Sequence, residues 1–117
     1  MGVQNKMKFR ETETLIRESG ATHRKNNEGV GGRLFLTNQR LIFKSHFFNI
    51  QVHEEVIPLE DIASIEAKHS DFISVKMSLN LKSGSTHTFL VHHRSEWIEE
   101  IVKAAEALMG DKIFVKR

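Results

Sequence analysis

A strict alternation of apolar and polar residues is the clearest pattern in the chain. From Ile73 to Leu81 every second residue is apolar and the residues between them are polar, which is typical of a strand with one buried face. The residues Lys82-Ser83-Gly84-Ser85 then favour a turn, and strand-favouring residues return from Thr86 to His92. Together these segments predict a β-hairpin.

A second hairpin is predicted around Asn38 and Gln39. The segments 33–37 and 40–46 are rich in strand-favouring residues, and Asn38 suits the positive φ of a tight turn. With these two residues as the loop, Arg33 lies opposite Lys44, and a slip by one residue would exchange the buried and exposed faces. In this register the core face consists of Leu34, Leu36, Leu41 and Phe43, and the other face of Arg33, Phe35, Ile42 and Lys44.

The remaining pattern adds more strands. Segments 13–19 and 22–25 favour a pair of strands interrupted at Gly20, and segments 54–59 and 62–66 favour two more, with a bend at Pro58. The Gly-rich segment 26–32 predicts a loop. About seven strands thus precede the single helix, which favours a β-sandwich or a partly open barrel.

The helix is predicted to start after Ser95, a good N-cap, and to stop at Gly110. Its apolar residues recur at helical spacing, and we expect them to plug one end of the barrel with Trp97 as the main anchor. A helix for a partner or a membrane is the alternative. The tail 112–117 is either an extra strand or a loose end. The apolar residues are Trp97, Ile98, Ile101, Val102, Ala105, Leu108 and Met109.

Composition narrows the class of protein. The 117 residues suffice for one domain, and the absence of cysteine excludes disulfides, cysteine-based zinc sites and thiol catalysis. No apolar stretch approaches the ~20 residues that span a bilayer. The N-terminus lacks the apolar region of a signal peptide, and Lys6 replaces the Ser or Thr of a myristoylation motif. We therefore expect a cytoplasmic protein that can associate with a membrane peripherally.

No group of residues predicts catalysis. His53-Glu54-Glu55-Val56-Ile57 starts like the zinc motif HExxH but has Ile57 where the second ligand belongs. The Gly-rich segment lacks the Lys-Ser/Thr pair of a P-loop. His87 and His93 would share one face of a strand and could join a metal site, although solvated or hydrogen-bonded histidines are favoured. We expect a non-enzyme that uses no cofactor and no metal.

The charge is unevenly distributed. The net charge of +2 is the sum of +5 in residues 1–46 and −3 in residues 47–117. Two cations opposite each other on paired strands repel, and a bound anion would relieve that repulsion. Neutralisation by Glu54 or Glu55 on the next strand is the alternative. The candidate anion-binding residues are His23, Arg24, Lys25, Arg33, Arg40 and Lys44.

A short apolar stretch follows the second hairpin. Phe47, Phe48 and Ile50 lie in a predicted loop, where they could enter a membrane interface or a dimer contact. Alternatively, they cover an open end of the barrel.

Three segments in order resemble one known family. The stretch Gly32-Arg33-Leu34-Phe35-Leu36-Thr37-Asn38-Gln39-Arg40-Leu41-Ile42-Phe43-Lys44-Ser45 resembles the signature of the GRAM domain. Glu13-Thr14-Leu15-Ile16 is similar to the family's opening strand, and the segment from Val56 to Glu66 is similar to its I-P-L-x-D-I-x-x-I-E motif. The resemblance extends from about Glu11 to Met109.

This resemblance implies a pleckstrin-homology-like fold, mainly β, in which two nearly orthogonal sheets of seven strands are capped by a C-terminal α-helix. It also implies a binding module for phosphoinositides or other membrane lipids, or for proteins. We expect residues 1–10 to form an N-terminal extension, 11–110 the domain and 111–117 a tail. A chain that hardly exceeds the domain resembles a stand-alone bacterial member.

The leading hypothesis is therefore peripheral association with an anionic membrane through the basic hairpin face. The alternative is a protein-interaction or self-association module that uses a strand edge or the Phe47–Ile50 loop. The expected partner is an anionic phospholipid headgroup or an acidic protein, with homo-oligomers possible in the second case. Nucleic acid is not expected, because the chain has no Tyr and its basic residues are not interleaved with aromatic ones.

Overall fold

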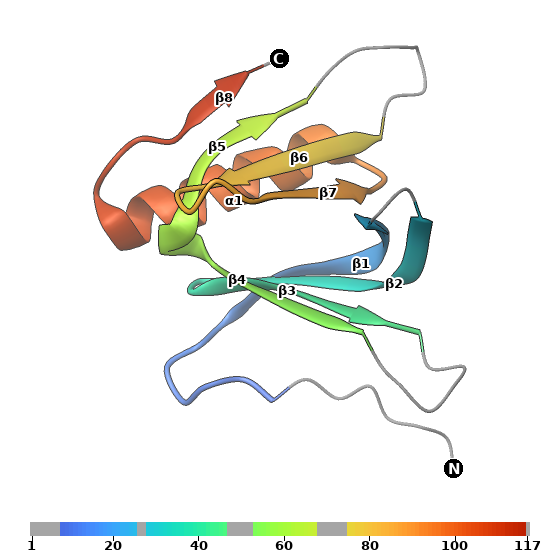
Figure 1. The fold of residues 1–117 in the computed structure, drawn as a ribbon. Helices are drawn as coiled ribbons and strands as arrows, with labels where there is room; N and C mark the ends of the chain where they lie inside the picture. The colour runs from blue at the N-terminus through green and yellow to red at the C-terminus, as the bar shows by residue number, and fades with distance from the viewer. Residues whose placement is uncertain (1–7, 26–27, 47–52, 68–74, 117) are drawn as a thin grey trace.

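The part of the chain that the structure describes forms one eight-stranded sheet and one α-helix (Figure 1). The computed structural model describes residues 8–25, 28–46, 53–67 and 75–116, with the backbone alone at position 25. The sheet has the order β4-β3-β2-β1-β7-β6-β5-β8. In chain order the elements are β1 (Leu15–Lys25), β2 (Glu28–Thr37), β3 (Arg40–Ser45), β4 (Glu54–Pro58), the 3₁₀ turn η1 (Leu59–Asp61), β5 (Ile62–Glu66), β6 (Lys76–Leu81), β7 (Thr86–Leu90), α1 (Arg94–Met109) and β8 (Phe114–Lys116).

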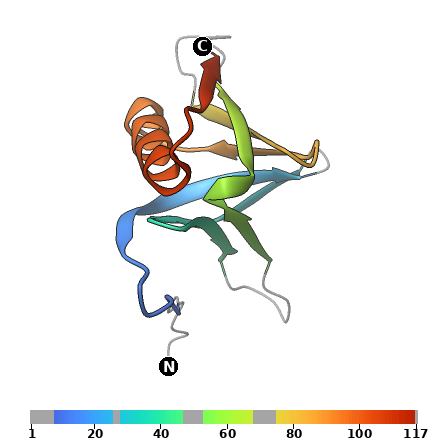
Figure 2. The same cartoon turned by 90° about the vertical axis from the view of Figure 1, so that its left-hand side faces the viewer.

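The sheet is bent over so that its two halves face each other (Figures 1 and 2). Strands β4 to β1 form one half, and β7, β6, β5 and β8 form the other. Between β1 and β7 only Thr22, His23 and Arg24 of β1 have partners, whereas β1 pairs with β2 along its whole length. The edge strands β4 and β8 are not paired with each other, so the barrel is open, as the sequence predicts.

The signature hairpin has the predicted register. Arg33 lies opposite Lys44, and the next three pairs towards the turn also match. Its core face is fully buried, as expected. On the other face, Phe35 and Ile42 are also buried, at 5% and 0% exposure, although they lie outside the main core.

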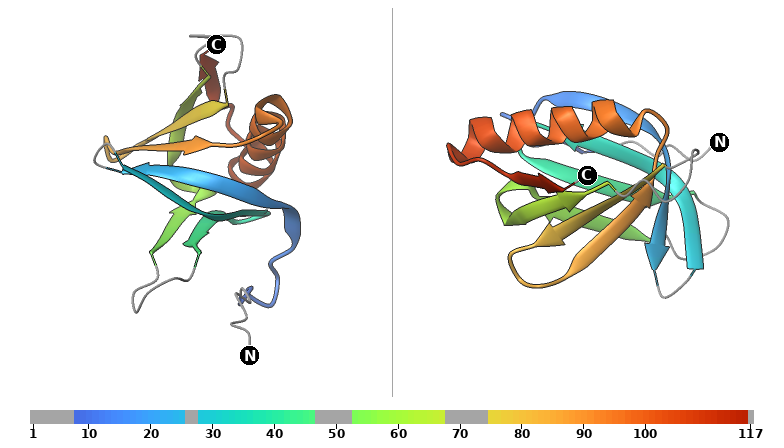
Figure 3. Two further views of the ribbon diagram at one scale, coloured as in Figure 1. Left: turned by 90° about the vertical axis from the view of Figure 1, so that its right-hand side faces the viewer. Right: turned by 90° about the horizontal axis from the view of Figure 1, so that it is seen from above.

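Helix α1 packs against the open side between the two halves (Figures 2 and 3). Trp97 is 0% exposed and is the largest side chain of the core, which confirms its role as the anchor. The predicted start was wrong by two residues. The helix begins at Arg94, and its N-cap is His93 in the left-handed region (φ 58°) without a side-chain cap bond. Gly110, at φ 79°, ends the helix as predicted.

Strand assignment differs from the prediction at Gly20 and in the Gly-rich segment, and it decides between the two alternatives left open for the tail. β1 is one continuous strand through Gly20, and the Gly-rich segment from Glu28 onwards is the start of β2 rather than a loop. Each residue of this segment pairs with β1, so the backbone partner and not the local sequence sets the conformation. The tail forms an eighth strand, because Phe114–Lys116 runs parallel to β5. Among the described residues, no helix is long and apolar enough to span a bilayer.

A close backbone approach explains Gly32. A Cβ atom at this position would lie 2.2 Å from the Lys44 carbonyl oxygen, a contact with backbone that no rotamer change relieves. At the neighbouring Gly31, a Cβ would meet only the His46 ring at 3.5 Å, an ordinary van der Waals distance.

We therefore predict that Gly32→Ala destabilises the fold by about 3 kcal/mol, because β2 and β3 must separate to admit the methyl group. Gly31→Ala is the matched control and should stay within about 1 kcal/mol of the parent. Urea unfolding of both variants measures the difference. Equal stabilities of the two variants would contradict the close approach.

Candidate functional site

The outer face of β1, β2 and β3 brings three of the predicted cations together. Gly20 lies opposite Arg33, which in turn lies opposite Lys44. Two and four residues further along β1, Thr22 lies opposite Gly31 and Arg24 opposite Gly29. Because side chains alternate along a strand, all these residues face away from the core. We call this surface the glycine face; it consists of Gly20, Gly29 and Gly31 with Arg24, Arg33 and Lys44.

The glycines leave this surface open. Gly20, Gly29 and Gly31 are all exposed. A Cβ atom on Gly20 would lie no closer than 3.9 Å to an atom of β2, and one on Gly31 would have the His46 ring at 3.5 Å. A Cβ on Gly29 would meet the Thr22 methyl group at 3.0 Å, so Thr22 covers that position. A ligand can thus approach the sheet backbone at Gly20 and Gly31, between the cationic side chains.

Carboxylates offset part of the positive charge. The Arg33 Nε donates to Glu18 Oε2 over 2.8 Å, and both side chains are more than a third exposed. The neutralising acid thus comes from β1 and not from Glu54 or Glu55, although Glu54 is the register partner of Lys44. Within the described part of the chain, neither Arg24 nor Lys44 takes part in an ion pair. These two cations remain available to an anion.

Arg40 has a different role from that predicted. It forms a bidentate ion pair with Glu13, in which Nε lies 2.7 Å from Oε2 and Nη2 lies 3.0 Å from Oε1. The Glu13 side chain has no exposure, and it also accepts a hydrogen bond from the Thr37 hydroxyl. Burial would favour the neutral carboxyl, but the hydrogen bonds from Arg40, the Arg10 amide and Thr37 outweigh it and lower the pKa of Glu13 to about 2. Arg40 therefore fastens the N-terminal segment to the signature hairpin.

The other predicted site residues lie elsewhere. His23 is 2% exposed and faces the core, where it contacts His53 and His87. The side chain of Lys25 and the residues Phe47, Phe48 and Ile50 lie outside the described residues. His87 and His93 do not share a strand face, because β7 ends at Leu90. Among the described residues, no group of three His, Asp or Glu side chains could hold a metal ion.

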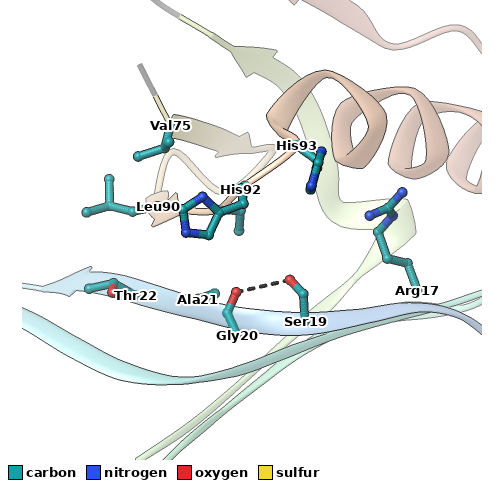
Figure 4. Close-up of a pocket in the computed structure, with 10 residues that line it drawn as sticks. Arg17, Ser19, Gly20, Ala21, Thr22, Val75, Leu90, His92 and His93 are labelled. Carbon is teal, nitrogen blue, oxygen red and sulfur yellow. Dashed lines mark hydrogen bonds between the residues drawn. The ribbon is translucent and has the colours of Figure 1, made fainter. Parts of the chain in front are cut away.

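Apart from the glycine face, a hollow of about 350 Å³ opens where β1 and the segment after β7 separate (Figure 4). Val75 and Leu90 line one side, and His92, His93 and Arg17 line the other (Figure 4). Arg17 is paired with Glu96 and Glu100 of α1, so its charge is compensated. The Ser19 hydroxyl donates to the Gly20 carbonyl over 3.0 Å and not to a histidine. Among the described residues that line the hollow, the Ser19 hydroxyl is thus directed to the backbone.

The sequence interpretation missed the glycines as part of a surface and Glu18 as the partner of Arg33. The alternation of β1 could have revealed both, because Glu18, Gly20, Thr22 and Arg24 are spaced two residues apart. The contact of three histidines from distant positions leaves no local signal.

Comparison with known proteins agrees with the fold. The sequence profile of the GRAM domain family matches residues 3–108. No protein among the curated sequences matches the chain.

Among solved structures, the N-terminal PH domain of Vps36 is similar with a TM-score of 0.69 and 18% identity, covering 88% of this chain and 86% of that chain. The hSac2 domain of the human phosphoinositide phosphatase Sac2 has a TM-score of 0.63 and 16% identity, over 92% of this chain and 78% of that chain. The Slm1 PH domain in complex with phosphoserine has a TM-score of 0.62 and 13% identity, over 79% of this chain and 96% of that chain. The fold is thus pleckstrin-homology-like.

The Glu13–Arg40 pair predicts how stability depends on acid. A folded-state pKa of about 2, below the ordinary 4.5, adds stability that is fully present above pH 4.5 and is lost as the pH falls towards 2. Glu13→Gln should lower the free energy of unfolding by about 2 kcal/mol at neutral pH and flatten its decline below pH 4.5. Glu11→Gln, at an exposed position, is the control. Urea unfolding at several pH values measures this change. If the free energy of unfolding of Glu13→Gln depended on pH as that of the parent does, the role of Glu13 would be disproved.

Proposed function

Because the chain belongs to the GRAM domain family, a family of lipid or protein interaction modules, we propose that it binds anionic phospholipid headgroups at a membrane surface through the glycine face. The observation that carries this proposal is the group of exposed glycines between Arg24, Arg33 and Lys44. Between these cations the face carries only the short Thr22 side chain and the ring of His46 beside Gly31, so a phosphate can come close to the guanidinium and ammonium groups.

The spread of the cations favours a membrane over a small soluble ligand. Arg24, Arg33 and Lys44 come from three neighbouring strands, and a layer of headgroups offers phosphate to each of them at once. Each basic residue near such a layer contributes about 1 kcal/mol, and the attraction weakens as salt is added. Phe47, Phe48 and Ile50 follow Lys44 closely in the sequence, and we include them in the proposal as an apolar contact with the membrane interface.

The names of the similar structures are consistent with this chemistry. The Slm1 domain was solved with phosphoserine, and the Sac2 domain comes from a phosphoinositide phosphatase. For this chain, both support a ligand that carries phosphate.

Association through a strand edge is the second candidate. β4 and β8 are the two edges of the sheet, and each exposes a large apolar residue, Val56 at 43% and Phe114 at 66%. Such edges can pair with another strand. Light scattering at increasing concentration tests this version, and a monomer throughout would exclude self-association.

We predict that the protein sediments with phosphatidylcholine vesicles that contain phosphatidylserine but not with vesicles of phosphatidylcholine alone. Arg24→Ala, Arg33→Ala and Lys44→Ala combined should lower the binding constant by about 10²-fold at low salt, given about 1 kcal/mol for each cation.

The control for this experiment removes the same charge elsewhere. Lys76→Ala, Lys103→Ala and Lys112→Ala combined changes three exposed cations on β6, α1 and the segment before β8, away from the glycine face. This variant should keep most of the binding. Equal losses in the two triple variants would show that net charge alone attracts the protein, and no binding by the parent would end the proposal.

A charge placed within the face gives an independent test. We predict that Gly31→Glu abolishes vesicle binding while the fold survives, because a Cβ is tolerated there and the carboxylate would repel phosphate from Arg33 and Lys44. Gly31→Ala should bind like the parent. Circular dichroism and urea unfolding establish that both variants are folded, and a folded Gly31→Glu variant that still binds would place the ligand elsewhere.

A further inference from the structure

Three histidines from distant parts of the sequence meet inside the bent sheet. We call the group of His23 from β1, His53 just before β4 and His87 from β7 the histidine cluster. His23 is at its centre: its Nδ1 lies 3.0 Å from His53 Nε2, and its Nε2 lies 3.3 Å from His87 Nδ1. The partner rings are inclined to the His23 ring by only 14° and 21°. Each contact is therefore a hydrogen bond between two ring nitrogens.

The surroundings of the cluster are aromatic on two sides and acidic on a third. The rings of Phe43 of β3 and Phe89 of β7 lie 5.4 and 4.8 Å from the His23 ring. The Glu55 carboxylate of β4 has one oxygen 3.9 Å from His53 Nε2 and the other 4.0 Å from His87 Nδ1. Arg24, the next residue of β1, faces the opposite side of the sheet.

The number of protons that this arrangement can hold follows from its geometry. A hydrogen bond between two ring nitrogens contains one proton, so the two contacts hold two. The outer nitrogens, His53 Nδ1 and His87 Nε2, hold at most one each, which gives four. Three neutral imidazoles carry three protons. The cluster can thus take up one extra proton with both contacts intact, but a second would place two N–H groups face to face.

Glu55 suits the first of these steps and not the second. One positive charge on the cluster is balanced by one carboxylate that touches both outer rings. A second positive charge would have no such counter-charge from Glu55. It would repel the first across about 3 Å, between the buried His23 ring and the rings of His53 and His87, which are 24% and 19% exposed.

The ring contacts cross one of the two shortest junctions of the sheet. His23 and His87 belong to β1 and β7, which are joined by only three residue pairs. His53 ties the segment before β4 to the same point, and its backbone N–H also donates a hydrogen bond to the Ser45 hydroxyl oxygen over 2.7 Å. Breaking a ring contact thus loosens either the join between the two halves or the segment that leads into β4.

We propose that the histidine cluster is a proton-operated switch at the β1–β7 junction, which keeps both ring contacts when it binds one proton and breaks one of them when it binds a second. A transition metal is not the intended ligand, because the two ring nitrogens of His23 point to different partners and do not converge on one ion. The proposal does not depend on the ligand of the glycine face.

The switch has a defined effect on stability. In the unfolded chain a histidine takes up a proton without breaking a contact, whereas the second proton costs the folded cluster one of its two ring contacts. The unfolded state then binds more protons, so stability falls as the pH drops from about 7 to about 5. This range lies above the one in which Glu13 titrates.

Urea unfolding of the full chain between about pH 7.5 and about pH 5, the range around the histidine pKa, tests the proposal. The urea concentration at the unfolding midpoint of the parent should decrease as the pH falls. In the variant His53→Gln with His87→Gln, each neighbour of His23 can donate or accept, so the loss should largely disappear. His92→Gln with His93→Asn removes two exposed histidines and should behave like the parent. A parent without a pH-dependent midpoint, or a loss that persists in the first variant, would overturn the proposal.

A second measurement needs no variant. In the parent protein, the amide protons of Thr22, His23 and Arg24 should exchange at least about tenfold faster relative to those of β3 at the acid end of the range than at the neutral end. Uniform exchange at both ends would contradict a local opening. A marked rise in melting temperature on adding zinc at neutral pH would also contradict it, by showing that the rings converge on a metal.

Discussion

The whole structure depends on β1 serving both halves of one sheet. A sheet that encloses a core by bending over itself needs a strand common to its two walls, and β1 pairs with β2 along its length but with β7 only at its end. The rest of its second edge is open, which is why α1 has to fill the gap between the walls. Trp97 supplies the bulk, and Arg17 of β1 links the two elements by pairing with Glu96 and Glu100 while its guanidinium carbon lies 5.6 Å from the centre of the Trp97 ring.

The same strand separates two kinds of chemistry by alternation alone. At the junction, His23 points inwards to two other imidazoles, whereas its neighbours Thr22 and Arg24 lie on the outer side of the sheet, with the glycine face. A proton acceptor and a cationic surface therefore occupy adjacent positions of one strand but opposite sides of the sheet. The GRAM signature hairpin then contributes Arg33 and Lys44 to the outer side and Phe43 to the inner side. Any displacement of β1 changes both environments together.

Local sequence determined the hairpin but not its surroundings. The register with Arg33 opposite Lys44 was predictable, because only this pairing around Asn38 buries the alternate apolar residues. The glycine segment was not, because residues without side chains carry no alternation and take their conformation from the strand beside them. The partner of Arg40 lies 27 positions away and the partners of His23 lie 30 and 64 positions away. Such contacts follow from topology, which a pattern confined to one segment does not contain.

Trp97 gives the molecule a spectroscopic property of its own. It is the single tryptophan of a chain without tyrosine, and it lies fully buried where α1 meets the sheet. Its indole Nε1 has no hydrogen-bond acceptor among the described residues, and the Arg17 guanidinium lies over its ring, so the emission wavelength depends on this one packed arrangement. The emission of the protein is therefore that of one site. The wavelength of maximum emission reports whether α1 is packed against the sheet, independently of the backbone signal that reports on the strands.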